Sequence, residues 1–415
     1  MPEIVVLGTE STMHHISPML EHFRERILIE PDWRPSVIAA HNPDLVITFE
    51  ESQSERGLCI AEMAKHQIAT LLMIDGIREW RNTWSRAQLP SERPTNQPII
   101  AHKVACLGRA DARLYESWGN VGKCEIVGAP RFDPLIERNI PIRIAPISDR
   151  PMRLLIMTAK TPGFTPEEIG ITLTSLADTN DILYKREDIQ VIWRATEGLH
   201  KQLGVKNTFD EAVGKELYEI LEWVDAVITT PSTAMLEAML FGLPVALLDY
   251  HNCPHYMPAA WRITCKNQIT SVLDDLKNVP LNRMLYQEFC LHDALSCRTL
   301  SLPNAIKLIE EMIRIKRNRD VNDLEELTFP HRILNRPEEF VSWPSENFCL
   351  KELYPSHPVF TRQDLVTMQS ELDAAIKTID QLKEQVKFLE NRLHGIPGYK
   401  LMTRIIKSFR KRISR

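Results

Sequence analysis

Short apolar runs alternate with amphipathic stretches along most of the chain. An apolar run bounded by turn residues is typical of a buried strand, and a period near 3.6 residues is typical of a helix. In the first part of the chain, strands are predicted over residues 3–8, 44–50, 68–75, 103–108 and 124–130. Helical spacing follows the first strand over residues 16–27 and recurs around residues 54–66. This order predicts parallel βαβ units and a doubly wound sheet.

The alternation stops at residues 139–151, where the sequence NIPIRIAPISDRP contains three prolines and no clear period. We interpret this segment as a linker. Strands are then predicted again over residues 153–159, 188–195, 225–230 and 244–250. The expected fold class is therefore α/β, with two tandem Rossmann-like doubly wound domains over residues 1–140 and 151–320. Two such domains usually leave a cleft that faces the carboxyl ends of their strands.

Residues 321–361 are rich in proline and acidic residues and have weak periodicity. Two interpretations stay open for them: a linker, or a segment that returns to pack on the first domain.

A heptad pattern begins at residue 365. Apolar residues alternate at spacings of three and four, at Leu365, Met368, Leu372, Ala375, Ile379, Leu382, Val386, Leu389 and Leu393. This strict period predicts a coiled coil over residues 362–394 and a homo-oligomer formed through residues 365–393. The alternative is a single amphipathic helix that lies on the globular body. The helix is predicted to end at Gly395.

The last segment, residues 398–415, is basic and amphipathic. On a helical wheel its apolar residues form one continuous arc, and all its basic residues except Arg412 lie opposite. It contains no acidic residue. This pattern predicts a helix that lies in an anionic membrane surface. A basic disordered tail or an RNA-binding arm would also fit this composition.

Composition and charge argue against several classes of protein. The formal net charge of -5 gives no overall reason to expect a nucleic acid partner. The eight cysteines form no CxxC pair, so a zinc site or a redox dithiol is not expected. The N-terminus lacks the pattern of a signal peptide, and no apolar run is long enough to span a bilayer. We expect a cytoplasmic protein, held peripherally on the inner face of the cell membrane by its basic tail.

The segment VDAVITTPSTAMLEAMLFGLPVALLDYHN, residues 224–252, predicts a complete β-α-β unit. Its β-branched first strand is typical of a buried parallel strand. Thr230 is expected to cap a helix that begins at Pro231 and ends near Phe241, with Gly242 as its stop. The helix N-terminus would then lie at the carboxyl edge of the sheet.

Hydroxyl groups and one carboxylate follow that strand. Ser232 and Thr233 would add donors to the free N–H groups of the helix N-terminus, which suits a phosphate or diphosphate. Thr230, at the start of the helix, is a candidate nucleotide-binding residue with them. Glu237 lies one turn further along the same face, where a carboxylate can accept hydrogen bonds from both hydroxyls of a ribose. The alternative is ordinary helix capping with a solvent-facing glutamate.

This segment resembles the nucleotide-binding motif of GT-B glycosyltransferases and their relatives. The matching residues are Asp225, the pair Ser232–Thr233, the pair Glu237–Ala238 and the turn Gly242–Leu243–Pro244. Relatives with this motif include the non-hydrolysing UDP-GlcNAc 2-epimerases and the CDP-glycerol glycerophosphotransferases, and the chain looks most like bacterial surface-polysaccharide members. The resemblance implies a nucleotide-sugar donor as substrate, with no separate cofactor.

Further donor-site residues are expected at two other strand ends. VIWRATEG stands where relatives often have a basic residue followed by His-Pro; Arg194 keeps the cation, but the His-Pro is missing. Arg194 is a candidate contact for the donor diphosphate. MTAKTPGF places Thr158 and Lys160 after the first strand of the second domain, as a second phosphate contact or as a plain turn.

The first domain supplies candidates for the general base that an inverting transferase needs. In GTESTMHH, either His14 or His15 would face the cleft, unless the histidine only makes a local hydrogen bond at the helix entry. Asp75, at another strand end, is a rival candidate.

Arg78, Trp80 and Trp84 would line an acceptor groove or serve as packing residues. The turn GAPRFD, residues 128–133, resembles a G-x-P-x-x-D turn of the same relatives and is expected to be structural.

The leading hypothesis is a nucleotide-sugar-dependent glycosyltransferase that builds a cell-surface polysaccharide on a glycan or lipid-linked acceptor. No DxD motif commits the chain to a metal ion. A sugar-nucleotide 2-epimerase is a second hypothesis, because Glu10, Asp75 and Glu79 would supply carboxylates for proton abstraction. A CDP-glycerol-type phosphotransferase on the same fold is a third hypothesis, and a non-catalytic, membrane-docked scaffold is a fourth.

Overall fold

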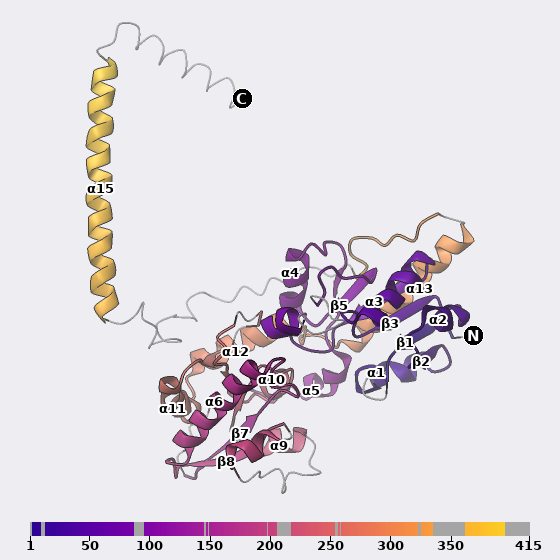
Figure 1. Cartoon of the computed structure of the whole chain (residues 1–415), viewed down its shortest axis with the longest axis horizontal. Coiled ribbons are helices and arrows are strands. Elements are labelled where there is room, and N and C mark those ends of the chain that lie inside the picture. The colour runs from indigo at the N-terminus through magenta and orange to yellow at the C-terminus, as the bar shows by residue number, and fades with distance from the viewer. Residues whose placement is uncertain are drawn as a thin grey trace. The chain divides into compact units, whose positions relative to one another are not determined.

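A computed structural model describes most of the chain. The described residues are 2–9, 13–86, 95–144, 147, 149–196, 198–205, 217–253, 256–257, 259–322, 325–334 and 362–394. The chain divides into two compact units, residues 1–347 and 348–415, and each is described by itself. The first unit contains two parallel sheets (Figure 1). We refer to the parts built on them as the first and second domains.

The first sheet has six parallel strands in the order β2-β1-β3-β4-β5-β6. The strands are β1 (Ile4–Leu7), β2 (Ile27–Glu30), β3 (Leu45–Thr48), β4 (Ala69–Met73), β5 (Lys103–Cys106) and β6 (Cys124–Ile126). All residues of β1, β3, β4 and β5 are buried. Such continuous apolar strands are typical of a parallel sheet covered on both faces. The five predicted strands are confirmed, whereas the half-buried edge strand β2 was not predicted.

The second sheet has five parallel strands in the order β11-β10-β9-β7-β8. They are β7 (Met152–Met157), β8 (Ile189–Arg194), β9 (Ala226–Thr229), β10 (Val245–Leu248) and β11 (Trp261–Ile263). The four predicted strands are confirmed, and the short edge strand β11 was not predicted. The strand order reverses beside the first strand of each sheet, between β1 and β3 and between β7 and β9. We refer to each of these reversals as the switch point of its sheet. Ligands of doubly wound folds bind outside the carboxyl ends of the strands at such switch points.

Helices connect the strands of each sheet (Figure 1). In the first domain they are α1 (Met13–Phe23), α2 (Pro35–Ala40), α3 (Ser54–Lys65), the π-helical turn η2 (Arg81–Ser85), α4 (Arg109–Ser117), the 3-10 turn η4 (Pro130–Phe132) and α5 (Asp133–Glu137). The second domain contains α6 (Pro166–Leu183), α7 (Leu199–Leu203), α9 (Leu217–Trp223), α10 (Ala234–Leu240), η5 (Lys266–Gln268) and α11 (Ile269–Lys277). Helices α12 (Leu281–Ala294) and α13 (Leu302–Val321) follow.

The chain returns to the first domain at α13, although the sequence pattern grouped residues 151–320 with the second domain. Buried side chains of α13, such as Leu308 and Met312, share a core with Ile4 and Val6 of β1. Figure 1 shows α13 beside β3, and the buried apolar side chains of the helix pack on the first sheet. The boundary between the domains along the chain therefore lies before α13.

Residues 325–334 stay on the first domain. The buried Lys103 donates to the carbonyl oxygens of Pro330 at 2.6 Å and His331 at 3.1 Å, and it pairs with Glu125 at 2.9 Å. Glu125 in turn accepts hydrogen bonds from the backbone nitrogens of Ile333 and Leu334. This part of the predicted segment 321–361 therefore returns to the first domain. Residues 335–361 lie outside the described residues.

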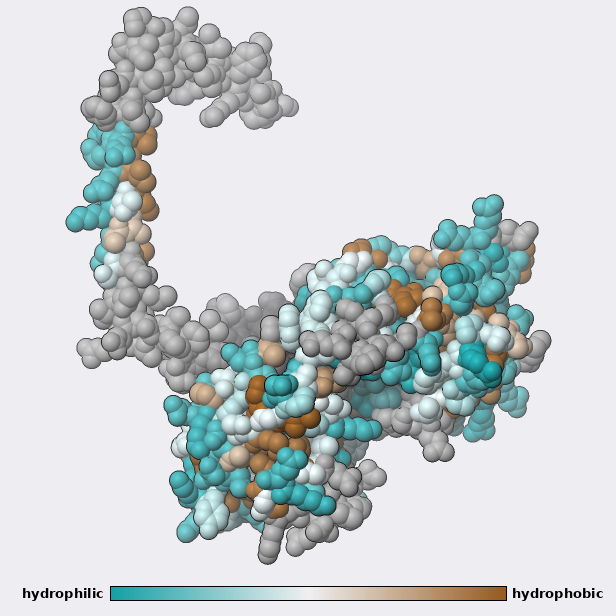
Figure 2. Space-filling model, viewed as in Figure 1, coloured by the Kyte–Doolittle hydropathy of each residue, from teal (hydrophilic) through white to brown (hydrophobic). Residues whose placement is uncertain are grey.

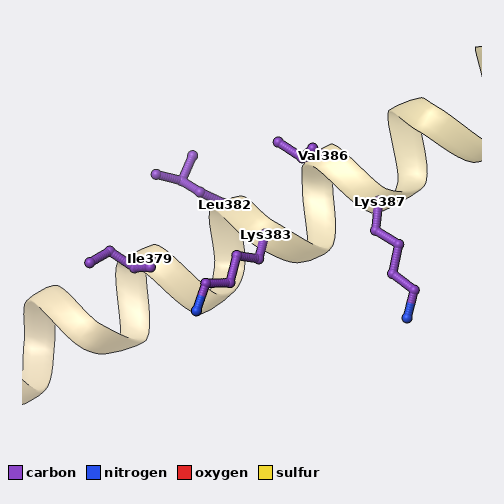
Figure 3. A pocket seen from close by; sticks show the side chains of 5 residues that line it. All are labelled: Ile379, Leu382, Lys383, Val386 and Lys387. Carbon is purple, nitrogen blue, oxygen red and sulfur yellow. The ribbon is translucent and has the colours of Figure 1, made fainter.

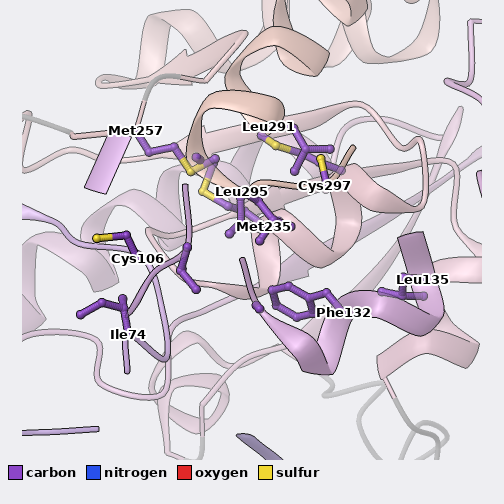
Figure 4. Close-up of a cluster of buried hydrophobic side chains, with 14 of the residues drawn as sticks. Ile74, Cys106, Phe132, Leu135, Met235, Met257, Leu291, Leu295 and Cys297 are labelled. Carbon is purple, nitrogen blue, oxygen red and sulfur yellow. The ribbon is translucent and has the colours of Figure 1, made fainter. Parts of the chain in front are cut away.

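One apolar core is shared by the two domains. It joins Ile74 and Phe132 of the first domain to Met235 of α10, and Leu291 and Leu295 at the end of α12 lie in the same cluster (Figure 4). Burial of this continuous apolar surface holds the carboxyl edges of both sheets near one another.

The described residues of the second compact unit form one long helix, α15 (Arg362–His394). Among its described side chains, the large exposed apolar ones run along one side (Figure 2): Leu372, Ile376, Ile379, Leu382 and Val386. Figure 3 shows Ile379, Leu382 and Val386 on one side of the helix, away from Lys383 and Lys387. The predicted helix is confirmed, and the coiled-coil pairing stays a prediction. The predicted tail helix, residues 398–415, lies outside the described residues.

Within the described residues, no helix combines the length and the apolar character needed to cross a bilayer.

Candidate functional site

Two predicted base candidates lie together at the carboxyl edge of the first sheet. His15 belongs to the first turn of α1, after β1, and Asp75 follows β4. The His15 Nε2 atom lies 3.9 Å from Asp75 Oδ2. The imidazole is largely buried, with its ring 5.3 Å from that of Phe49, whereas the Asp75 carboxylate is 44% exposed. The two side chains approach one another at the carboxyl edge of the first sheet, where a protonated imidazole would pair with the carboxylate. The side chain of His14 lies outside the described part of the structure.

The loop after β4 carries the predicted acceptor residues. Arg78 donates from Nε to the hydroxyl of the buried Tyr115 at 3.0 Å. Trp80 is exposed, and its ring lies 5.5 Å from that of Trp84. The acceptor groove itself stays a prediction.

Glu79 and Arg81, from the same loop, form a buried ion pair of 2.9 Å. Arg81 also donates to the carbonyl oxygen of Pro162 at 3.1 Å and to His251 Nε2 at 3.2 Å, both in the second domain. Because arginine has no acceptor, His251 Nε2 accepts this hydrogen bond. Glu79 therefore takes part in a contact between the domains, and Glu10, another predicted carboxylate, lies outside the described residues.

Hydroxyl groups tie the strand ends of the second sheet to one another. Thr158 Oγ1 accepts a hydrogen bond from the backbone nitrogen of Thr196 at 2.8 Å. Thr230 Oγ1 accepts one from the backbone nitrogen of Ala159 at 2.8 Å. Both threonine side chains are buried, and Lys160 is exposed. The two hydroxyls thus hold β7, β8 and β9 in place at the switch point.

The start of α10 differs from the prediction. Thr230 does not cap this helix, because its hydroxyl serves the β7 strand end instead. The helix begins at Ala234, and Ser232 Oγ accepts from the Ala234 backbone nitrogen at 3.2 Å in a tight local turn. The predicted stop is confirmed, since Gly242 follows the helix with a φ of +67°.

Thr233 contacts the first domain. Its Oγ1 atom accepts a hydrogen bond from the backbone nitrogen of Ile77 at 3.1 Å. A Cβ atom added to Gly76 would lie 2.3 Å from the same oxygen, so only glycine permits this approach. The hydroxyl predicted to face a phosphate is therefore engaged by the loop that carries Asp75.

Two arginines act on the carboxyl group of Glu237. Burial raises the pKa of its carboxyl group, while the nearby guanidinium groups of Arg131 and Arg194 act in the opposite direction. Arg131 also donates from Nη2 to the carbonyl oxygen of Asp75 at 3.0 Å. A structural role was predicted for the turn that contains Arg131, and no separate role for its side chain, whose partners come from distant parts of the chain. Its position after β6, at the carboxyl edge of the first sheet, was the available signal.

Within the described residues, no group of three or more His, Cys, Asp or Glu side chains is placed to hold a metal ion.

No family model matches the chain, and no curated protein matches its sequence. Solved structures do match in fold. MnaA of S. aureus with UDP matches with a TM-score of 0.53 and 12% identity over 76% of this chain and 97% of that one. The UDP-N-acetylglucosamine 2-epimerase of Rickettsia bellii matches with a TM-score of 0.51 and 13% identity over 77% and 98%. The wall teichoic acid polymerase TagF gives 0.48 and 13% over 76% and 89%.

The chain has a GT-B fold. Identity this low establishes architecture alone, so the chemistry must be argued from the side chains. In this GT-B fold, the first domain presents His15 and Asp75, and the second presents Glu237 and Arg194. Arg131 donates to the carbonyl oxygen of Asp75, and its charge acts on Glu237.

Proposed function

We propose that the protein is a nucleotide-sugar-dependent glycosyltransferase of cell-surface polysaccharide biosynthesis, acting at the cytoplasmic face of the membrane. One observation carries the proposal. An imidazole–carboxylate pair, His15 and Asp75, lies at the carboxyl edge of the first sheet, where Arg131 donates to the Asp75 carbonyl oxygen. The charges of Arg131 and of Arg194 in the second domain both act on the Glu237 carboxylate. This is the division of labour that transfer between a nucleotide sugar and an acceptor hydroxyl requires.

In the proposed reaction, the first domain holds the acceptor. His15 takes the proton of the acceptor hydroxyl as a general base, and the Asp75 carboxylate stabilises the imidazolium that forms. The acceptor oxygen forms a bond to the anomeric carbon, and the bond from that carbon to the diphosphate oxygen breaks. The electron pair leaves with the nucleoside diphosphate. Asp75 itself, with its more exposed carboxylate, is the rival base.

The second domain holds the donor in this proposal. Glu237 accepts hydrogen bonds from the ribose hydroxyls, and Arg194 lies close to the departing diphosphate, whose charge a guanidinium stabilises. Ser232, Lys160 and the Thr233 hydroxyl are further proposed phosphate contacts. We propose no separate cofactor and no metal ligand among these residues.

The test is incubation of the full chain with UDP-, GDP-, CMP- and CDP-linked donors and lipid-linked acceptors. Release of the nucleotide together with an extended acceptor is the expected result. Glycerol phosphate transfer from a CDP-linked donor would instead identify a CDP-glycerol-type phosphotransferase. Nucleotide binding without any turnover would favour a membrane-docked scaffold and contradict the proposal.

A sugar-nucleotide 2-epimerase is the second candidate. It is favoured by the fold match to the 2-epimerase of Rickettsia bellii. The Glu79 carboxylate argues against it, because this side chain is buried in an ion pair with Arg81 and is poorly placed to abstract a proton from a sugar. Isomerisation of the donor sugar without an acceptor in the same assay would establish this activity and overturn transfer.

Membrane attachment is proposed for residues 398–415, on the basis of their basic and amphipathic sequence. Deleting residues 396–415 is expected to release the full chain from vesicles that contain anionic lipid, without changing its thermal unfolding. Vesicles of neutral lipid alone are the control. Undiminished binding of the truncated chain to anionic vesicles would overturn this part of the proposal.

A further inference from the structure

The turn over residues 128–133 is held in place by its glycine and its aspartate, and these contacts leave the role of the Arg131 side chain unexplained. Gly128 adopts a φ of +94°, and a Cβ there would lie 2.1 Å from Ser301 Oγ. The Asp133 carboxylate accepts hydrogen bonds from the backbone nitrogens of Ser301 and Leu302, each at 2.8 Å, at the start of α13. These contacts fasten the turn to the helix that returns to the first domain. They also fix the backbone from which Arg131 projects.

The Arg131 side chain turns toward the carboxyl edges of the sheets. Its Nη2 atom donates to the carbonyl oxygen of Asp75 at 3.0 Å, and its charge acts on the carboxylates of Glu237 and Asp75. Burial lowers the pKa of this guanidinium, and the two carboxylates offset only part of that decrease. A cation that has lost much of its water gains from an anion that enters beside it.

Arg194 approaches the same place from the second domain. It is the last residue of β8, and its backbone oxygen accepts a hydrogen bond from Thr158 at the end of β7. Its guanidinium, like that of Arg131, acts on Glu237. Arg131 and Arg194, from different domains, therefore lie at the carboxyl edges of the two sheets, and the charges of both act on Glu237.

We propose that Arg131 is a donor-binding residue that, together with Arg194, holds the diphosphate of a nucleoside diphosphate or its sugar. The proposal rests on the proposed function and names a site residue that the sequence motif did not supply. A diphosphate carries charge on two phosphoryl groups, and each guanidinium can donate a two-pronged set of hydrogen bonds to one of them. Arg131 thus completes the phosphate site from the first domain, so that binding also joins the two domains.

The experiment measures binding to the full chain by calorimetry, with UDP, CDP, GDP and ADP as probes. The tightest of these is then compared with its own nucleoside monophosphate and nucleoside. R131Q is expected to weaken binding of the diphosphate at least about tenfold, since hydrogen bonds between charged groups are lost. Binding of the nucleoside should change little. R131K keeps the positive charge but loses the two-pronged donor geometry of the guanidinium, so its affinity for the diphosphate should lie between those of R131Q and the wild type.

R138Q is the matched control, because Arg138 lies close by in the chain, is 45% exposed and pairs with Glu222 on the surface. It should bind every probe as the wild type does, and thermal unfolding should show that both variants are folded. Equal loss of diphosphate and nucleoside in R131Q would show that Arg131 only supports the Asp75 loop, which overturns the proposal. Wild-type diphosphate affinity in R131Q, with loss in R194Q, would overturn it and leave the proposed function standing. Failure of the wild type to bind any nucleotide would refute the proposed function itself.

Discussion

The Nε2 atom of His15 lies 3.9 Å from the Oδ2 atom of Asp75, although the two residues come from different strand ends of the first sheet. The sequence motifs made them rivals for one role. The structure makes them neighbours, so that each changes the electrostatic field of the other. A carboxylate beside an imidazole favours its protonated form, which a general base reaches after taking the acceptor proton.

The first prediction concerns this pair. D75N and H15Q should each lower the rate of glycosyl transfer by about a hundredfold or more, the usual range for a lost general base or its partner. Donor binding, measured by calorimetry, should stay within about twofold of the wild type. H22Q is the control, because His22 lies on the same helix with 45% of its side chain exposed. Full activity in both H15Q and D75N would remove the pair from the reaction.

The second prediction concerns Gly76 and Thr233. In G76A the new methyl group meets Thr233 Oγ1, which should destabilise the first compact unit by about 1–3 kcal/mol. T233A alone loses the hydrogen bond from Ile77 and should cost about 1 kcal/mol.

In the double variant G76A/T233A the clash is absent, so the cost should be smaller than the sum of the two single costs. Urea denaturation of the four proteins measures this coupling energy. Strict additivity would mean that the close approach of Gly76 to Thr233 does not exist in solution.

The third prediction is that E237A weakens nucleotide binding by about 1–3 kcal/mol, because the carboxylate no longer accepts hydrogen bonds from the ribose. Removal of the 2′-hydroxyl from the nucleotide should weaken its binding to the wild type. The same removal should weaken binding to E237A by a smaller factor. E222A, which removes an exposed surface carboxylate, is the matched control. Unchanged affinity in E237A would exclude Glu237 from the site.

The strands were predictable because burial on both faces of a parallel sheet leaves an unmistakable apolar run, as in β4 and β9. The two missed strands, β2 and β11, are short edge strands. Every residue of β2 is only partly buried, so its pattern does not differ from that of a loop. The return of α13 to the first domain could not be read from its sequence, because an amphipathic helix does not reveal which sheet it covers.

The site was predictable only in part. The placement of His15 and Asp75 at one edge follows from the rule that carboxyl ends of parallel strands meet there, whereas their contact was not predicted. The hydrogen bond from Ala159 to the Thr230 hydroxyl could not be predicted. A threonine at this position can equally cap the following helix or accept a hydrogen bond from a neighbouring strand end. Nor could the partners of Arg131 be predicted, because they are distant in sequence from it.

The fourth prediction concerns α15. The exposed apolar side of this helix is predicted to pair with a second copy of the chain. L382K would place a charge in the paired surface and should shift the full chain toward the monomer. Light scattering over a range of concentrations measures the mass. Q381K, which adds the same charge at the neighbouring exposed residue, should leave the oligomer intact. An unchanged mass for L382K would show that this side of the helix is not the interface.

The fifth prediction is a pH dependence of stability that arises at His102. The backbone nitrogen and the hydroxyl of Thr70 lie 3.2 Å and 2.7 Å from His102 Nδ1, and the backbone N–H can only donate. The folded protein therefore holds a neutral imidazole. Burial, aided by the nearby Lys123, lowers the pKa of His102 to about 4, whereas an unfolded histidine titrates near 6.5.

Because the folded-state pKa lies below the unfolded one, the contribution of His102 is fully present above pH 6.5. It is lost as the pH falls from there toward 4, by on the order of 1 kcal/mol per pH unit. Urea denaturation at pH 7.5 and 5.5 should show this loss in the wild type. In H102N, whose side-chain oxygen can take the place of Nδ1 but does not titrate, the loss should be smaller by about that amount. H66N, which removes an exposed histidine, should behave as the wild type does. An identical pH dependence in H102N would place the acid-sensitive group elsewhere in the molecule.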